Sequence, residues 1–445
     1  MIYPQAPNFE SIVLQRLRNA GIHYGTSTFE IRRIAQLSIL CFLVTNVTQV
    51  IALFMAKEDP NKLFACFSVL SFCLMGFLKL WSLIGNQGSW RFLIAKASFM
   101  ESDQLKYNQN VMPDYESDDE EENHFSKHIQ SYTKNFLTIS TYLSRIYSFT
   151  AVVFIASPFI EYRIYVWQGK DVIESPHILP GWAPLEMYPF GYGLTILAES
   201  IAAVYCVMVH VAFDLTAVGL MIFIRGQFSL LYAYSENIGG IGQKCNLSKK
   251  RDDRAHFRII KCHQIHVSLL RSVKELGKLI ENILGIYFFV ATLTLCSVAV
   301  QLKWQQLSAT QLISLLQYMC ATLTQLYLFC HYGDAVFNES SVTLGSGPFS
   351  AACWCVSSKI RREIALLCVG MSRPCRMRAG LFNWLDLPSF IQLRMGVCSA
   401  WYGRATVRLS WLNASYGQPT VIMQYYDKHQ NELLSSLTCN KHTRI

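Results

Sequence analysis

The residues best suited to chemistry in this sequence are three ionisable side chains within one apolar run, residues 194–224. Glu199, His210 and Asp214 lie in this run, and the last two are four residues apart, so they share one face of a helix. An ionisable group inside an apolar helix normally faces a cavity or a protein partner. Two interpretations stay open: the side chains form hydrogen bonds between helices, or they line a path for a ligand or an ion, with Asp214 the weaker ligand contact.

Other residue patterns give no support for an enzyme or a metal protein. The sequence contains no G-x-S-x-G, H-E-x-x-H or G-K-[ST] motif. The acidic run at 114–122 lacks the alternating ligands and central glycine of a calcium loop. Cys353 and Cys355 form a single C-x-C without a second cysteine pair, which argues against zinc. We expect no enzyme activity, no resident metal and no cofactor.

The fifteen cysteines are predicted to be thiols rather than disulfides. Most lie in or beside long apolar runs, where a small side chain such as Cys41, Cys73 or Cys206 packs as an apolar residue. A disulfide framework is typical of short secreted chains, and this chain has 445 residues.

The elements that would position these side chains are membrane-spanning helices. The chain is 52% apolar and only 16% charged, and a helix that crosses a bilayer needs about 20 apolar residues. Six runs meet this length, and a seventh contains Pro388 and Arg394. We predict an all-α polytopic membrane protein with seven transmembrane helices, at 34–55, 63–84, 136–160, 194–224, 283–301, 311–330 and 381–402.

The distribution of Lys and Arg predicts how these helices are oriented. The segments before the first span and after the second, fourth and sixth hold 26 basic residues, whereas those after the first, third and fifth hold 5. Basic residues are retained on the cytoplasmic side. We therefore predict a cytoplasmic N-terminal segment at 1–33, a seven-span domain at 34–402 and an atypical tail at 403–445, with the C-terminus outside. A G-protein-coupled receptor would have the opposite polarity.

The fifth span is predicted to continue beyond the membrane as a long helix. From Ile265 onward, Leu269, Leu276 and Ile280 recur at helical spacing. Such an amphipathic extension on the cytoplasmic side can pack against partner helices.

The second half of the sequence resembles the insect odorant-receptor family at several places that occur in the family's order. A His at 263 lies where that family starts the long helix into its fifth span. The other matching residues are Leu179, Pro180, Trp182, Tyr188, Pro189 and Phe190 in the loop after the third span, and then 329–334, Ser340, Ser341, Trp354, Arg361, Arg362, Met371, Arg373, Pro374, 379–382, Leu387 and Phe390.

The resemblance implies a function as well as a topology. It implies an odorant-specific subunit of a ligand-gated, nonselective cation channel that detects small volatile apolar molecules. Such a subunit joins the shared olfactory co-receptor in a heterotetramer in the plasma membrane, where its partners are the odorant, the co-receptor and the lipid bilayer, and no nucleic acid. Cytoplasmic parts of spans four to seven would form the intersubunit anchor. A gustatory-receptor-like chemosensory channel and a seven-span G-protein-coupled receptor are the alternatives.

A ligand pocket is expected in the outer halves of the helices. Small-molecule sites are concave and mostly apolar, with a few polar groups. With the N-terminus inside, the outer halves are the starts of spans two, four and six and the end of span three. The aromatic and polar candidates there are Phe67, Phe72, Phe149, Phe154, Tyr205, Met208, Tyr318 and Thr322.

Overall fold

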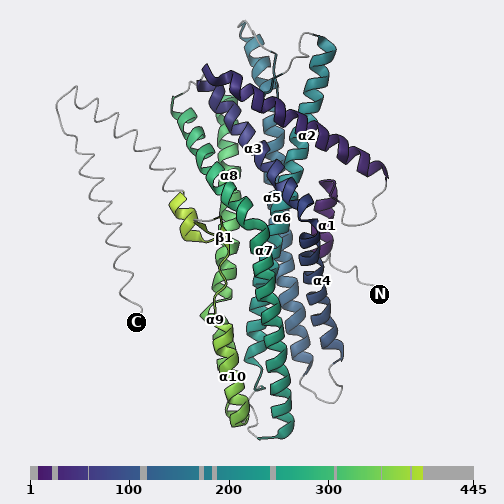
Figure 1. Ribbon diagram of the computed structural model, residues 1–445, viewed down its shortest axis with the longest axis vertical. Helices are drawn as coiled ribbons and strands as arrows, with labels where there is room; N and C mark the ends of the chain where they lie inside the picture. Colours follow the sequence, from purple (N-terminus) through teal and green to yellow (C-terminus); the bar gives the residue numbers. More distant parts are fainter. Residues whose placement is uncertain are drawn as a thin grey trace, which may run out of the picture. The chain divides into compact units, whose positions relative to one another are not determined.

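The computed structural model describes residues 9–22, 29–58, 60–110, 118–169, 175–182, 188–240, 247–304, 308–351, 353–380 and 383–393. Nearly all of these residues are helical (Figure 1). The helices are α1 (Phe9–Asn19), α2 (Phe29–Met55), α3 (Pro60–Gly85), α4 (Gln87–Asn110), α5 (Asp118–Trp167), α6 (Pro189–Glu236), α7 (Lys249–Trp304), α8 (Ala309–Glu339), α9 (Val342–Ser350) and α10 (Ser358–Met371), with 3-10 turns η1 (Ala56–Glu58) and η3 (Cys353–Cys355).

Six helices in the described part of the chain are long and apolar enough to cross a membrane: α2, α3, α5, α6, α7 and α8. They contain the first six predicted spans, so the all-helical expectation is confirmed for this part. The seventh predicted span, 381–402, begins differently, because Asn383–Trp384 forms strand β2 and the following helical turn starts at 387. Its remainder, from Arg394, and the predicted tail at 403–445 lie outside the described residues.

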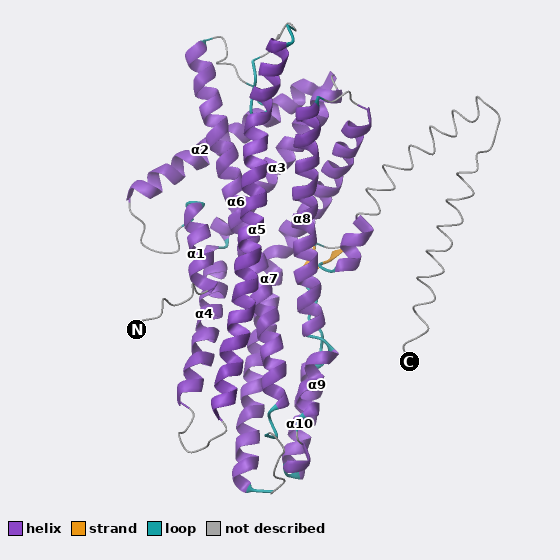
Figure 2. Cartoon of the chain, turned by 180° about the vertical axis from the view of Figure 1, so that it is seen from behind, coloured by secondary structure: helices purple, strands orange, loops and turns teal. Residues whose placement is uncertain are grey.

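Helix α6 lies at the centre of the bundle. In its most apolar stretch 83% of the residues are buried, compared with 17% in α2, which lies at the periphery. It packs against α1, α2, α3, α5, α7, α8 and α9, and Figure 2 shows these neighbours around it from behind. The side chains of α6 therefore face protein on nearly every side, which is where ionisable residues are tolerated in a membrane helix.

Helix α7 confirms the predicted long extension of the fifth span. It runs without a break for 56 residues, a length of about 84 Å at 1.5 Å per residue, whereas the hydrocarbon core of a bilayer is about 30 Å thick. Leu269, Leu276 and Ile280 are fully buried. This stripe packs the extension into a second bundle with α4, α6 and α10 (Figure 1).

A short hairpin connects α10 to the last described turn and docks on two helices. Strands β1 (Arg378–Ala379) and β2 (Asn383–Trp384) are antiparallel. Gly380, at φ +73°, donates its amide to the carbonyl of Glu281 on α7 over 2.8 Å. A Cβ on Gly285 would lie 2.6 Å from the Cα of Gly380, and one on Gly333 of α8 would overlap Leu385. The hairpin thus reaches the helix backbones only because these positions are glycines.

Replacing Gly285 with alanine is expected to destabilise the protein by about 1–3 kcal/mol, because the new methyl group overlaps the backbone of Gly380. Gly277→Ala on the same helix is the matched control, since nothing lies within 4 Å of a Cβ there. Alanine at that position should leave stability unchanged or raise it by up to about 1 kcal/mol. Melting temperatures of the two purified variants in detergent provide the measurement, and equal melting temperatures would contradict the close approach.

Candidate ligand-binding site

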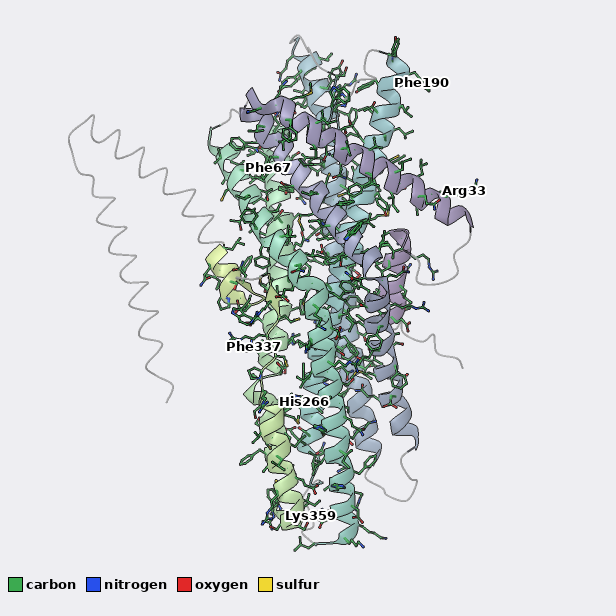
Figure 3. All side chains as sticks on the ribbon, in the orientation of Figure 1. Arg33, Phe67, Phe190, His266, Phe337 and Lys359 are labelled. Atoms are coloured by element: carbon green, nitrogen blue, oxygen red, sulfur yellow. The ribbon has the colours of Figure 1, made fainter. Side chains whose placement is uncertain are left out.

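One end of the helix bundle contains a cavity of about 620 Å³. Its walls come from helices α3, α5, α6, α7 and α8, and Leu179 of the loop before α6 contributes a further side chain. Figure 3 shows Phe67 of α3 and Phe190 of α6 toward this end of the bundle, and Lys359 of α10 at the opposite end. The cavity therefore lies far from helix α10 and from the extension of α7 that packs against it.

The lining of the cavity suits a small apolar molecule with one polar group. Apolar side chains dominate, and hydroxyls and amides are contributed by Ser68, Thr150, Ser157, Gln301, Gln311 and Ser314. The buried hydroxyl of Ser314 has no hydrogen-bond partner among the described residues. The volume lies within the usual 300–1,000 Å³ of small-molecule sites, which also have this mixture of side chains.

The structure brings three of the eight sequence-predicted ligand residues into this cavity. Phe72 of α3, Phe154 of α5 and Tyr318 of α8 line it together. The rings of Phe72 and Tyr318 meet edge to face, with centroids 6.3 Å apart. These three predicted residues therefore lie on three of the helices that form the cavity.

The other five predicted residues lie away from the cavity lining. Phe149 is 56% exposed on the outer surface of α5, and Phe67 and Met208 are half-buried elsewhere on their helices. Tyr205 is buried, but its hydroxyl donates to the carbonyl of Ala20 over 3.2 Å. Thr322 donates its hydroxyl to the carbonyl of Tyr318 one turn back in α8. The sequence pattern does not indicate the face of the helix on which a residue lies.

Glu199 fixes the loop that contributes Leu179 to the cavity. Its carboxylate accepts hydrogen bonds from the amides of Ile178 and Leu179, at 2.9 and 3.3 Å, and lies 3.0 Å from Nδ1 of His177. The loop is also tied to α2, because the amide of Trp182 donates to the carbonyl of Thr48. Glu199 thus differs from both interpretations offered by the sequence: its partners are in a loop, and it lies behind the cavity wall.

Replacing Glu199 with alanine is expected to free this loop. The amide hydrogens of Ile178 and Leu179 lose a charged acceptor, which corresponds to about a tenfold or greater increase in their exchange rates with solvent. Hydrogen-exchange mass spectrometry on peptides covering 175–182 measures the change. Glu339→Ala is the control, because Glu339 pairs with Arg225 on a partly exposed surface and should leave exchange at the loop unchanged. Equal exchange in Glu199→Ala and the unmodified chain would contradict the role of Glu199.

Asp214 is the centre of a buried polar network that joins five helices. Its Oδ1 accepts a hydrogen bond from Lys79 of α3 over 2.7 Å, and both side chains are fully buried. Its Oδ2 accepts from Tyr147 of α5 over 2.6 Å and from Gln325 of α8 over 2.8 Å. Gln325 in turn accepts from Tyr287 of α7 over 2.6 Å. The interpretation of Asp214 as a hydrogen-bonding residue between helices is therefore correct.

His210 connects this network to the cavity. Lys79 can only donate, so Nδ1 of His210, 3.0 Å away, is the acceptor, and Nε2 carries the hydrogen that reaches the carbonyl of Phe72 at 3.2 Å. The imidazole also stacks on the Phe72 ring with centroids 4.2 Å apart. Through His210, the polar network thus holds Phe72, which lines the cavity. Lys79, the partner that sequence analysis did not identify, was visible as a single basic residue in an apolar run.

The cysteines agree with the prediction of thiols. Every cysteine that the structure describes is free, and several are buried between helices. Within the described ranges no group of three or more His, Cys, Asp or Glu side chains is arranged to hold a metal ion.

Comparisons with known proteins agree with this architecture. The family model of the 7tm odorant receptors matches residues 59–396. Odorant receptor 13a of Drosophila melanogaster is 25% identical over 213 residues, which are 45% of this chain and 49% of that receptor, so the match spans about half of the relative's length.

Two solved structures share the fold at 15% identity. They are those of the olfactory receptor OR5 from the insect Machilis hrabei. With eugenol bound, that structure gives a TM-score of 0.70 over 90% of this chain and 98% of the receptor. The other OR5 structure gives 0.71 over 89% and 97%.

The family match covers most of the chain and includes the cavity and all the motifs that follow the sixth span. It confirms the resemblance seen in the sequence, and together with the apolar helices it identifies a multi-pass membrane protein of a receptor family rather than an enzyme family. The chain belongs to the 7tm odorant receptor family.

Proposed function

We propose that this chain is an odorant-specific subunit of a heteromeric, ligand-gated, nonselective cation channel, and that its 620 Å³ cavity binds a small volatile apolar molecule. The observation that carries the proposal is the cavity itself, a mostly apolar space between five helices in a chain with the odorant-receptor fold. The related OR5 structure in complex with eugenol supports a ligand of that size.

The ligand is held in this proposal by Phe72, Phe154 and Tyr318. Burial of apolar groups contributes about 0.8 kcal/mol per CH₂, and one hydrogen bond to a lining hydroxyl or amide orients the molecule. The unpaired hydroxyl of Ser314 is a suitable partner. Binding opens the channel only if the ligand has a higher affinity for the open form than for the closed form.

The proposed orientation places the N-terminus, the extension of α7 and helix α10 in the cytoplasm. It places the cavity in the outer half of the membrane. The distribution of basic residues supports this orientation, since the segments on the proposed cytoplasmic side hold 26 Lys and Arg against 5 on the other. In the proposal the plasma membrane is that of an olfactory sensory neuron.

A partner surface for the co-receptor is proposed on α9, α10 and the turn between them. Phe349 is 78% exposed, Trp354 64%, Leu366 74% and Val369 66%. Apolar side chains gathered in this way mark an interaction site between proteins. In the proposal this surface contributes to the anchor of a heterotetramer with the co-receptor.

The proposal is tested by recording currents from cells that express the chain alone or with the olfactory co-receptor. We expect an odorant-evoked cation current only from the pair, and we expect it to persist in excised patches that lack nucleotides and G proteins. A response that disappears without G-protein signalling would favour the G-protein-coupled alternative. An odorant response of the chain alone would contradict the requirement for a co-receptor.

A further inference from the structure

Two thiols lie next to each other in the wall of the cavity. Cys73 of α3 and Cys206 of α6 both line it. Gln49 of α2 donates its Nε2 hydrogen to Sγ of Cys73 over 3.6 Å. A Cβ on Gly76 would lie 2.8 Å from Sγ of Cys206, so the glycine leaves room for this thiol. Odorant binding as proposed above does not use the pair.

The surroundings of the pair favour nucleophilic chemistry at Cys73. A thiol reacts through its thiolate, which hydrogen-bond donors and nearby cations stabilise. The Cys73 sulfur accepts the hydrogen bond from the Gln49 amide. The remaining polar groups of the described lining are hydroxyls, amides and the amine of Lys62, all weaker nucleophiles toward a soft carbon centre.

The position of the pair supplies the second requirement, which is a bound reaction partner. A molecule in the cavity is held against the sulfur, and such proximity replaces a bimolecular encounter by a reaction within one complex. Volatile molecules with a carbon–carbon double bond conjugated to a carbonyl group are small, apolar and electrophilic, so they match both the cavity and the thiol.

We propose that Cys73 and Cys206 form a covalent capture site for α,β-unsaturated carbonyl volatiles, with Cys73 as the attacking residue. Sγ of Cys73 forms a bond to the β-carbon, the π electrons of the double bond move to the α-carbon, and the thiol proton of Cys73 ends on that carbon. The adduct contains every atom of both reactants, so no oxidant or reductant is needed. Gln49 supplies the hydrogen bond that stabilises the charge on the Cys73 sulfur.

This inference rests on the proposed function, because it assumes that volatile molecules enter the cavity. It adds a prediction that simple binding does not make. A ligand that is bonded to α3 stays in the cavity after washing, whereas its saturated counterpart leaves.

The test uses the purified full-length chain in lipid nanodiscs, incubated with oct-1-en-3-one or with octan-3-one, which lacks the double bond. Peptide mass spectrometry is expected to find the adduct on Cys73 with the first ketone and not with the second. Cys73→Ser should lack this adduct, and Cys320→Ser, which changes an exposed thiol on α8, should retain it. Gln49→Leu should form the Cys73 adduct at least about threefold more slowly, because the sulfur loses its hydrogen-bond donor.

Labelling confined to thiols outside the cavity, or found on Cys206 in place of Cys73, would overturn the assignment. Size-exclusion profiles establish that each variant is folded, and Cys73→Ala repeats the test if the serine variant is not. Currents are recorded separately. An adduct on Cys73 without any odorant-evoked current supports the capture site and contradicts the proposed channel. A current from oct-1-en-3-one without the adduct supports the proposed channel and contradicts the capture site.

Discussion

Replacing Asp214 with asparagine is expected to remove most of the folded receptor from the cell surface. The change leaves the ammonium of Lys79 fully buried without a counter-ion. Removing one partner of a buried ion pair costs about 3–5 kcal/mol, which is a large part of the 5–15 kcal/mol that stabilises a typical protein. Here the loss is reinforced, because the same carboxylate accepts hydrogen bonds from Tyr147 and Gln325. Surface biotinylation and the melting temperature of the purified chain measure the effect.

The double variant Lys79→Met with Asp214→Asn distinguishes loss of the pair from loss of either residue. With both charges gone, no ion is left unpaired, so more than half of the lost stability should return. The exposed pair of Lys278 and Glu275 on α7, 3.4 Å apart, is the control, and Lys278→Met should have little or no effect. If the double variant were as unstable as Asp214→Asn, an unpaired buried charge would not be the cause.

Replacing Ala151 with phenylalanine is expected to abolish the response to every odorant of a panel, or to weaken it by more than about tenfold. Assembly should stay intact. Ala151 lines the cavity on α5, and a benzyl group at that position occupies space that a ligand needs. Loss of a few apolar contacts, each buried CH₂ contributing about 0.8 kcal/mol, is enough for a tenfold change in affinity. Dose–response curves with the co-receptor provide the measurement.

Val152→Phe is the matched control for this change, because it places the same benzyl group on the next residue of the same helix, at a side chain that is 64% exposed. Its odorant responses and its surface expression should equal those of the unmodified chain. An Ala151→Phe receptor with an unchanged response profile would show that odorants bind elsewhere in the molecule.

The helices themselves could be predicted from the sequence because hydrocarbon imposes a simple length requirement. Runs of about 20 apolar residues have few alternatives to a spanning helix, since every backbone amide and carbonyl must be paired within the segment. The extension of α7 was also predictable, because Leu269, Leu276 and Ile280 mark one face in an otherwise polar stretch. Strand β2 in the region after residue 381 could not be predicted from the sequence. It belongs to a hairpin that packs closely on the helices at glycines, as where Gly380 approaches Gly285.

The sequence predicted helices that form the candidate site but not the faces that line it. Phe149 and Phe154 were both placed at the outer end of the same helix, yet the first is exposed on the surface and the second lines the cavity. Five residues turn a helix by about 140°, so the two side chains cannot face the same way. In a soluble protein the polar face would reveal which side is outside. In a membrane helix both the lipid and the protein interior accept phenylalanine, and this signal is lost.

By itself, the sequence determined that the chain spans the membrane with apolar helices, that it belongs with the odorant receptors, and that Asp214 needs a partner. It also contained Lys79 as a single charge in an apolar run. Only the tertiary structure decided that these two residues pair across 135 positions, and that Cys73 meets Cys206 in the wall of a cavity. The physical reason is that residue type and local spacing fix the environment a side chain requires, whereas its partner is chosen by how separate helices pack.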